Sequence, residues 1–265
     1  MTLALALTLL ALGFLGAIVA GLLGVGGAIV MIPLLLYGPP LLGVGALDMK
    51  NVAGVTMVQV FVAAVSGMIA HRRHHAVHAR LAWIGGTAMA AGTLSGALAS
   101  SRLPDVVLLA VFALMATVAA VLMFLPLETV GRPLFAEHVT FEPSRAIAVC
   151  LGVGIAAGLV GAGGAFLLVP LLLFVVGIPI RVAIGSSLAI TALASFAGVA
   201  GKLVTGQVPL GPAVAVALGA MPGAQLGGRL SRRVSGARLK LMLGIIVVVS
   251  ALRVWIDLFD RLLRP

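Results

Sequence analysis

The chain has 265 residues, of which 62% are hydrophobic and 9% are charged, and its net charge is +10. About a quarter of the residues in a typical soluble domain are charged, so this composition excludes a soluble protein and predicts an integral membrane protein. The basic residues lie in short loops between apolar segments, where they set orientation in a membrane. Membrane lipids are therefore expected partners, and nucleic acid is not.

The first apolar segment runs from Leu3 to Leu36 and is 34 residues long. A transmembrane helix needs about 20 apolar residues, so this segment is too long for one crossing. A glycine cluster at residues 24–27 is the natural break. The two half-helices then form either a kinked crossing or a re-entrant hairpin. No basic residue precedes Leu3, so we expect the segment to belong to the mature fold rather than to a cleaved signal peptide.

The rest of the chain predicts one more broken segment, at residues 145–176, and six further helices. The pattern lacks the alternation of membrane β-strands, so the spans are expected to be helical. We predict an all-α polytopic membrane protein made of two repeats of four helical segments, residues 1–126 and 145–265, joined by a linker at 127–144. The six helices are expected at residues 49–70, 81–101, 103–126, 182–204, 211–230 and 239–259.

The repeat is visible in the sequence itself. Residues 21–36 read GLLGVGGAIVMIPLLL and residues 158–173 read GLVGAGGAFLLVPLLL, and ten of the 16 positions are identical at a shift of 137. Downstream, Thr191 and Phe196 correspond to Thr56 and Phe61 at a shift of 135. Two glycine pairs with the spacing that favours close helix contact also correspond: Gly92 with Gly96, and Gly223 with Gly227.

Glycine clusters inside apolar segments leave backbone N–H and C=O groups poorly shielded. Lipid offers them no hydrogen bonds, so such backbone is tolerated only where protein buries it or where it lines a polar cavity. Paired breaks in the two halves of a membrane protein therefore indicate a binding site. Close helix packing through small residues is the alternative explanation.

The basic residues distinguish two topologies. If all eight segments cross, the 17 Lys and Arg residues divide nine to eight between the two sides, which favours no orientation. If both broken segments are re-entrant, the division becomes eleven to six, a positive-inside pattern. Each half then has three crossings, so the second half is inverted relative to the first, both termini face outward, and the two glycine turns meet near the middle of the membrane.

The paired motifs, Gly24-Val25-Gly26-Gly27 with Pro33 and Gly161-Ala162-Gly163-Gly164 with Pro170, resemble those of the TauE/SafE sulfite exporter family of membrane permeases. The segments RVAIGSSLAITA (181–192) and MPGAQLGGRL (221–230) are similar to further patterns of that family. The resemblance implies a multi-pass protein of the bacterial inner membrane. It also implies secondary transport of small sulfur-containing or organic anions such as sulfite or sulfonates. In the first half the corresponding region reads Asp48-Met49-Lys50-Asn51, which leaves the anion open.

The N–H groups at a helix start lack intrahelical partners and carry the positive end of the helix dipole, so they suit an anion. Ser, Thr, Asn and Gln side chains add further donors, and an intramembrane lysine is a candidate for function. For Lys50 the alternatives are snorkelling to the interface or pairing with Asp48. For the hydroxyls of Ser186, Ser187 and Thr191 and for the Gln59 amide, the alternative is a structural hydrogen bond. The predicted substrate-binding residues are Gly24, Gly26, Gly27, Ala28, Lys50, Asn51, Gln59, Gly161, Gly163, Gly164, Ala165, Ser186, Ser187 and Thr191.

Other chemistry has little support. Four histidines, His71, His74, His75 and His78, lie in a basic loop without a nearby carboxylate or thiol, so no metal site is expected. A nucleotide-binding loop is absent, so ATP is not the direct energy source, and coupling to a proton or another ion stays open. No cofactor is expected, and the protein is not expected to be an enzyme. Transport of small carboxylates and a non-transporting membrane subunit are the alternative functions; the oligomeric state stays open.

Overall fold

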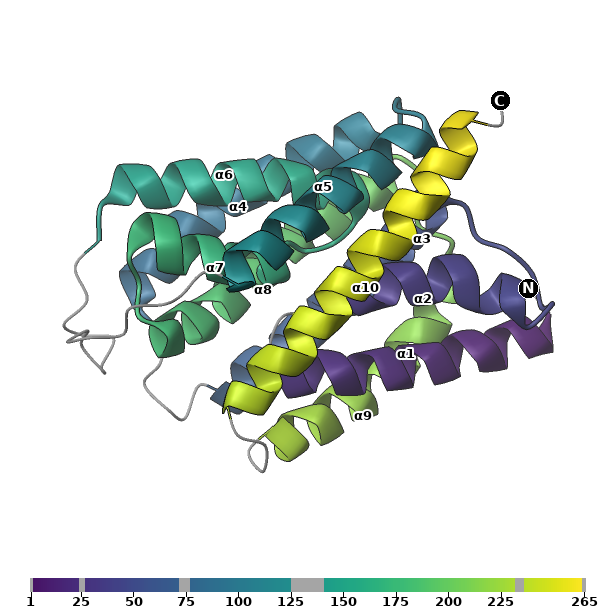
Figure 1. The fold of residues 1–265 in the computed structure, drawn as a ribbon, viewed down its shortest axis with the longest axis horizontal. Coiled ribbons are helices and arrows are strands. Elements are labelled where there is room, and N and C mark those ends of the chain that lie inside the picture. Colours follow the sequence, from purple (N-terminus) through teal and green to yellow (C-terminus); the bar gives the residue numbers. More distant parts are fainter. Residues whose placement is uncertain (1, 24–26, 72–76, 125–140, 232–235, 264–265) are drawn as a thin grey trace.

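The computed structural model describes residues 2–23, 27–71, 77–124, 141–231 and 236–263, and its regular elements there are helices (Figure 1). The first half contains α1 (Leu3–Leu23), α2 (Ala28–Leu41), α3 (Met49–His71), α4 (Ala79–Ser100) and α5 (Asp105–Phe124). The second half contains α6 (Pro143–Val160), α7 (Ala165–Leu171) with its π-helical continuation η3 (Leu172–Val176), α8 (Ile180–Val204), α9 (Leu210–Ser231) and α10 (Gly236–Leu263). Each expected helix is present, with ends within a few residues of the prediction.

Among the described residues, seven helices are long and apolar enough to cross a membrane: α1, α3, α4, α5, α6, α8 and α9. This confirms a polytopic all-α membrane protein. The 14 residues of α2 extend about 21 Å, which is less than the hydrocarbon thickness of about 30 Å. The second short element, α7 with η3, is likewise too short to cross.

The first broken segment folds as a hairpin, not as one kinked crossing. Met31 and Leu34 of α2 lie against Gly16 of α1, and Gly38 lies against Leu12, so α2 returns alongside α1 toward its start. In the second half, Gly164 lies against Val153 and Ala157 of α6 in the same manner. The reversal occurs at the glycine motif in both cases; Gly24 and Gly26 themselves lie outside the described residues.

The two halves exchange packing partners. Helix α1 of the first half packs mainly on α9 of the second, and α6 of the second packs mainly on α4 of the first. The predicted glycine pairs form these contacts, because a Cβ on any of them would collide with a facing carbonyl. Gly92 and Gly96 meet the carbonyls of Leu151 and Ile155; Gly223 and Gly227 meet those of Phe14 and Ile18. The predicted close helix contacts are confirmed.

Corresponding helices run in opposite directions. In Figure 1, α1 runs from right to left, whereas α6 runs from left to right. Helices α3 and α8 pack side by side between the α1–α9 and α4–α6 pairs, and the rings of Phe61 and Phe196 lie 5.9 Å apart. The predicted inverted repeat agrees with these directions and stays a prediction, as do the boundaries of the two repeats and of the linker, most of which lies outside the described residues.

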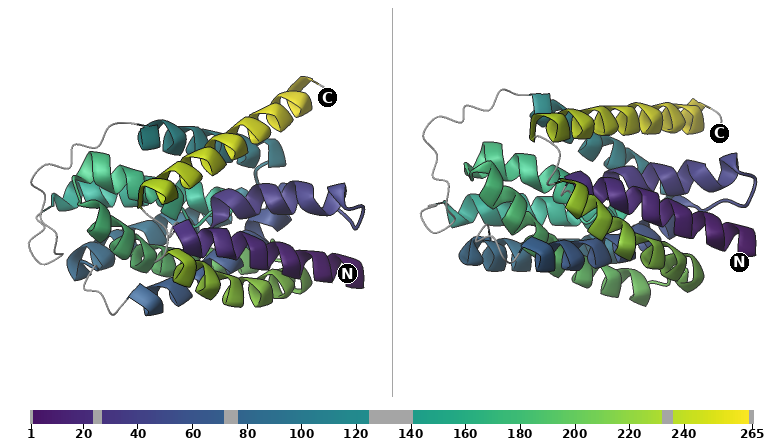
Figure 2. Two further views of the ribbon diagram at one scale, coloured as in Figure 1. Left: turned by 60° about the horizontal axis from the view of Figure 1, so that its bottom comes forward. Right: turned by 90° about the horizontal axis from the view of Figure 1, so that it is seen from below.

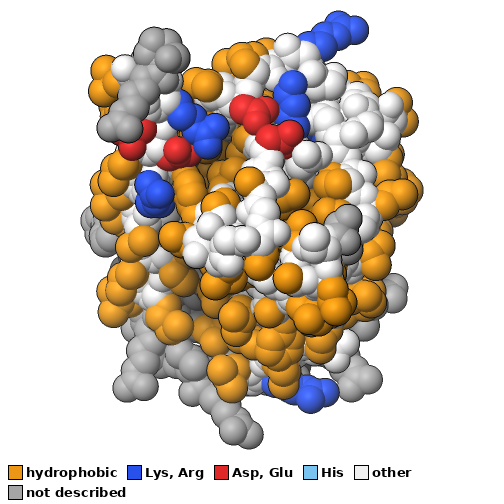
Figure 3. Space-filling model, turned by 90° about the vertical axis from the view of Figure 1, so that its right-hand side faces the viewer, with side chains coloured by type: hydrophobic (Ala, Val, Ile, Leu, Met, Phe, Trp, Pro, Cys, Tyr) orange, Lys and Arg blue, Asp and Glu red, His pale blue; other side chains and the backbone are white. Residues whose placement is uncertain are grey.

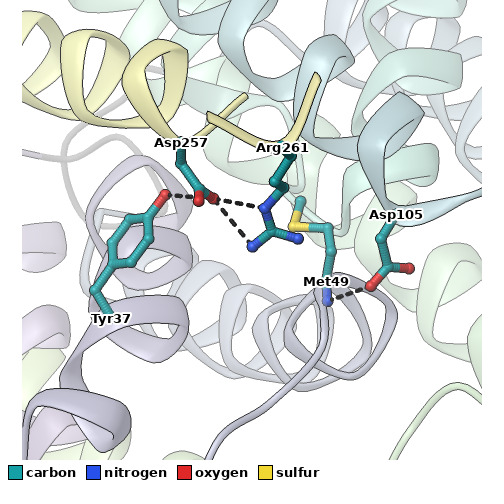
Figure 4. Close-up of polar contacts among 5 residues, drawn as sticks. All are labelled: Tyr37, Met49, Asp105, Asp257 and Arg261. Atoms are coloured by element: carbon teal, nitrogen blue, oxygen red, sulfur yellow. Dashed lines mark hydrogen bonds and ion pairs between the residues drawn. The ribbon is translucent and has the colours of Figure 1, made fainter. Parts of the chain in front are cut away.

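Helix α10 lies across α5 on the outside of the bundle (Figure 2). Its C-terminal half is bound to α2: Asp257 accepts a hydrogen bond of 3.2 Å from Tyr37 and pairs with Arg261 at 3.0 Å (Figure 4). Arg253 lies 4.4 Å from the centre of the Tyr37 ring. Figure 3 shows that charged side chains gather in the upper part of this end of the molecule, while apolar side chains cover much of the rest.

Candidate functional site

The two glycine turns lie against neighbouring residues in the middle of α3. A Cβ on Gly27 would collide with Ala20 and would lie 3.4 Å from Nε2 of Gln59. A Cβ on Gly163 would collide with Val60 and would lie 3.5 Å from Cγ2 of Thr191. Because Gln59 and Val60 are neighbours in the middle of α3, turns from the two halves reach the same level of the molecule.

Glycine is required at these turns by backbone conformation as well as by space. Gly27 has a φ of 79°, and Gly161, Gly163 and Gly164 have φ values of 73°, 59° and 72°. Side chains rarely adopt this left-handed region. Gly27 and Gly164 are the N-caps of α2 and α7, and neither position provides a side-chain hydrogen bond to the helix. The first N–H groups of both helices therefore lack the acceptor that Ser, Asp or Asn supplies at other helix starts.

Buried polar side chains without hydrogen-bond partners lie on the helices around the two glycine turns. Thr56 and Gln59 on α3, Thr93 on α4 and Thr191 on α8 are 0% exposed. Within the part of the chain that is described, the three hydroxyls and both polar atoms of the Gln59 amide have no hydrogen-bond partner. Such a group costs about 1–3 kcal/mol when it stays unsatisfied, so a set of them marks a place for water or a ligand.

The members of this set lie on helices that pack against one another, α3, α4 and α8. Thr56 and Gln59 are three residues apart on one face of α3. A Cβ on Gly198 of α8 would lie 2.7 Å from Cγ2 of Thr93 and from Cε of Met57, which places Thr93 beside the α3–α8 contact. We name as the central site Gly27, Gly163, Thr56, Gln59, Thr93 and Thr191, together with the helix starts at Ala28 and Ala165.

Two of the predicted site hydroxyls, those of Ser186 and Ser187, already form hydrogen bonds within the protein. Ser186 Oγ accepts a hydrogen bond of 3.0 Å from the backbone N–H of His78. Ser187 Oγ donates to the carbonyl of Ile184 at 2.9 Å. Both lie on the first turns of α8, and Ser187 is one helical turn before Thr191. Their structural hydrogen bonds match the alternative that the sequence left open, and their contact with a substrate stays a prediction.

Lys50 and Asn51 lie at the start of α3, away from Gln59 and Gly27, although Gly161 of the second turn packs against Ala53 nearby. Lys50 Nζ donates to the carbonyl of Ser101 at 3.1 Å, at the end of α4. Lys50 is nine residues before Gln59, about 13 Å along a helix axis. The backbone N–H of Asn51 donates to Asp48 at 2.7 Å, and that of Met49 donates to Asp105 at 2.9 Å (Figure 4). These two carboxylates cap the start of α3.

Three buried polar residues lie outside the set of predicted substrate-binding residues: Thr56, Thr93 and Lys202. The correspondence with Thr191 was the signal that identifies Thr56. The expectation that basic residues lie in the loops is wrong for Lys202, which is 0% exposed in the last turn of α8. The spacing of polar residues on α4 gave no comparable signal for Thr93.

The histidine cluster is only partly described. His74 and His75 lie outside the described residues, whereas His78 caps α4, with Nδ1 accepting from the N–H of Leu81 at 3.1 Å. No group of three metal-ligating residues occurs in the described ranges.

Comparison with known proteins gives one consistent result. Residues 9–254 match the family described as "Sulfite exporter TauE/SafE". A "probable membrane transporter protein" of Xylella fastidiosa (strain Temecula1 / ATCC 700964) is 32% identical over 242 residues, which cover 88% of each chain. The "probable membrane transporter protein YunE" of Bacillus subtilis (strain 168) is 24% identical over 261 residues, which cover 91% of this chain and 94% of the relative. No solved structure matches.

Proposed function

The chain belongs to the sulfite exporter TauE/SafE family, and we propose that it is a secondary transporter that exports small sulfur-containing or organic anions, such as sulfite or sulfonates. The family and the names of the relatives make it a multi-pass membrane transporter, in bacteria one of the cell membrane, and not an enzyme. The anion and the direction of transport are the proposal.

The observation that carries the proposal is the set of unpartnered donors in the central site. The Gln59 amide and the hydroxyls of Thr56, Thr93 and Thr191 are buried, and each can donate to an oxyanion oxygen. The helix start at Ala28 adds free backbone N–H groups and the positive end of a dipole. Among the described residues, no Asp or Glu is buried, so no carboxylate repels an anion there.

The size of the central site favours a small anion. Gly163 lies so close to Val60 of α3, and Gly27 so close to Ala20 of α1, that neither residue can carry even a Cβ. Sulfite and short sulfonates present several acceptor oxygens on one compact group, which suits donors that converge from three helices.

Export needs no nucleotide. A membrane potential that is negative inside drives an anion outward by about 2.3 kcal/mol per charge for each 100 mV. This energy suffices for facilitated export, and coupling to a proton or another ion would add to it.

Counterflow in proteoliposomes tests the proposal. Labelled sulfite, sulfoacetate and a small carboxylate would be offered to vesicles preloaded with the unlabelled anion. We expect accumulation of label for the sulfur oxyanions in the wild type, and a loss of at least tenfold in Gln59→Leu. Gln225→Leu, an exposed position on α9, is the matched control.

The outcomes separate the alternatives. Accumulation of the carboxylate but not of the sulfur oxyanions would assign the alternative substrate class. No accumulation of any of the three anions by folded protein would contradict transport and would favour a supporting membrane subunit. Net flux of the anion, measured in both directions across vesicles of known orientation, then tests the direction of transport.

A further inference from the structure

Lys202 is a buried cation without a buried anion beside it. Its side chain is 0% exposed. Nζ donates to Ser100 Oγ at 2.7 Å, to Gln207 Oε1 at 2.9 Å and to the carbonyl of Leu159 at 3.1 Å. All three acceptors are neutral. In the described ranges the ion pairs join Arg145 to Glu142 and Arg261 to Asp257, so neither involves Lys202.

This arrangement is costly as a purely structural feature. A charged group taken out of water loses far more free energy than neutral hydrogen bonds restore, unless an opposite charge accompanies it. The ends of α4 and α6, which supply Ser100 and the Leu159 carbonyl, offer only partial negative charge. Lys50 brings a second cation to the same end of α4, through its bond to Ser101, and this raises the positive potential further.

The other groups around Lys202 can change partners. Gln207 is 5% exposed, and its amide presents Oε1 to Lys202 while Nε2 donates to Thr205 at 2.6 Å and to the Ala97 carbonyl at 3.3 Å. Rotation of this amide would turn a donor toward the space beside Nζ. The Ser100 hydroxyl, which now donates to the Ala97 carbonyl at 2.6 Å or to Gln207 Oε1 at 3.0 Å, can donate to an anion instead, so both neighbours can bind an anion together with the ammonium group.

Lys202 lies near the central site along helices α8 and α4. Gly198 lies one helical turn before Lys202 on α8 and contacts Thr93. Ser100 lies seven residues after Thr93 on α4, two turns along the same face of the helix. The second glycine turn is adjacent, because Leu159 precedes Gly161 by two residues and Gly161 packs against the backbone of Ala53.

We propose that Lys202, Ser100 and Gln207 form a second oxyanion-binding site, the Lys202 site, on the route between the central site and the end of the molecule where α3 begins. Its ligand is a small anion with a sulfite, sulfonate or carboxylate group, which supplies the missing negative charge. The inference rests on the proposed function, since the same anion would occupy both sites in turn.

The variant Gln207→Glu gives the sharpest test. It places a carboxylate oxygen where Oε1 already lies 2.9 Å from Nζ, so it supplies a fixed counter-charge and competes with any anion. If Lys202 were only structural, pairing it would leave transport unchanged. If Lys202 binds the anion, we expect the KM for sulfite in counterflow to rise at least tenfold, with the maximal rate changed by less than about threefold.

Two further variants complete the experiment. Lys202→Met removes the charge and should raise the KM for sulfite in the same way. If this variant fails to fold, the KM of Gln207→Glu alone tests the Lys202 site. Gln225→Glu makes the same change at an exposed position of α9 and should leave the KM as in the wild type.

The failures are distinguishable. Wild-type vesicles without sulfite counterflow would contradict the proposed function for that anion. Wild-type counterflow with an unchanged KM in Gln207→Glu would overturn the Lys202 site alone.

Discussion

Thr56 and Thr191 lie at corresponding positions of the two halves, 135 residues apart, and each buries a hydroxyl that has no hydrogen-bond partner among the described residues. One is on α3 and the other on α8, the two helices that pack together in the middle of the bundle. A polar group that is kept unsatisfied in both halves is difficult to explain by stability, because satisfying or removing it would stabilise the fold. We propose that a ligand that binds between the halves explains it.

Thr191→Val tests this explanation. Valine has nearly the same shape and lacks the hydroxyl, so the variant should be as stable as the wild type or more stable by about 1 kcal/mol. We expect anion counterflow to fall at least tenfold at the same time. Thermal unfolding in detergent and counterflow rates measure the two effects.

The matched control for Thr191→Val is Thr87→Val. Thr87 is exposed on α4, and its hydroxyl bonds to the carbonyl of Trp83 in its own helix at 2.9 Å. This variant should keep the wild-type rate of transport. Thr191→Val with full transport would remove that hydroxyl from the central site.

Gly27→Ala should reduce both stability and transport. The φ of 79° would cost a side chain about 1–2 kcal/mol, and the new Cβ would collide with Ala20, which adds about 1–3 kcal/mol of overpacking. Gly177→Ala separates the two effects, because Gly177 has the same φ of 79° but open space around it. A larger loss of unfolding free energy in Gly27→Ala than in Gly177→Ala is expected; equal losses would contradict the close approach to α1.

Gly96→Ala tests the contact between α4 and α6. Its Cβ would collide with the carbonyl of Ile155 and the nitrogen of Leu159, so the helices must separate, at a cost of about 1–3 kcal/mol. Gly152→Ala is the control on the facing helix: nothing lies within 4 Å of its Cβ, and alanine should stabilise α6 by up to about 1 kcal/mol. Opposite shifts of the unfolding midpoint are the expected result, and a destabilised Gly152→Ala would show that its face is not free.

The sequence predicted the elements well because hydropathy and glycine spacing are local signals. Runs of apolar residues defined the helices, and the glycine pairs that begin at Gly92 and Gly223 identified close contacts of α4 with α6 and of α1 with α9. The repeat identified Gly27 and Gly163 as corresponding turns. Whether the first segment crosses or reverses depends on packing between α1 and α2, so the charge distribution could favour a reversal and the structure was needed to show it.

Lys50 and Lys202 show that local sequence patterns do not predict which lysine is buried. Lys50 and Lys202 both lie near the end of an apolar helix, and the sequence treated Lys50 as a site residue and Lys202 as a flanking charge. Lys202 is buried because α4, α6 and the segment that carries Gln207 converge on it. These contacts join residues up to 102 positions apart in the chain. The pattern of residues within α8 therefore cannot predict them.

Lys50→Met tests the cation that the sequence selected. We expect anion counterflow to fall while the amount of folded protein stays unchanged, because Lys50 adds positive charge at the end of α4 beside the Lys202 site. Lys50 is only half-buried, so added salt should screen its contribution, since the Debye length falls from about 10 Å at 0.1 M to about 3 Å at 1 M. The wild type and Lys50→Met should therefore differ most at low ionic strength, whereas the effect of Lys202→Met should persist in high salt. Lys50→Arg keeps the charge and should keep most of the rate. Equal rates of the wild type and Lys50→Met at low ionic strength would remove Lys50 from the anion route and leave it as a helix-end contact with Ser101.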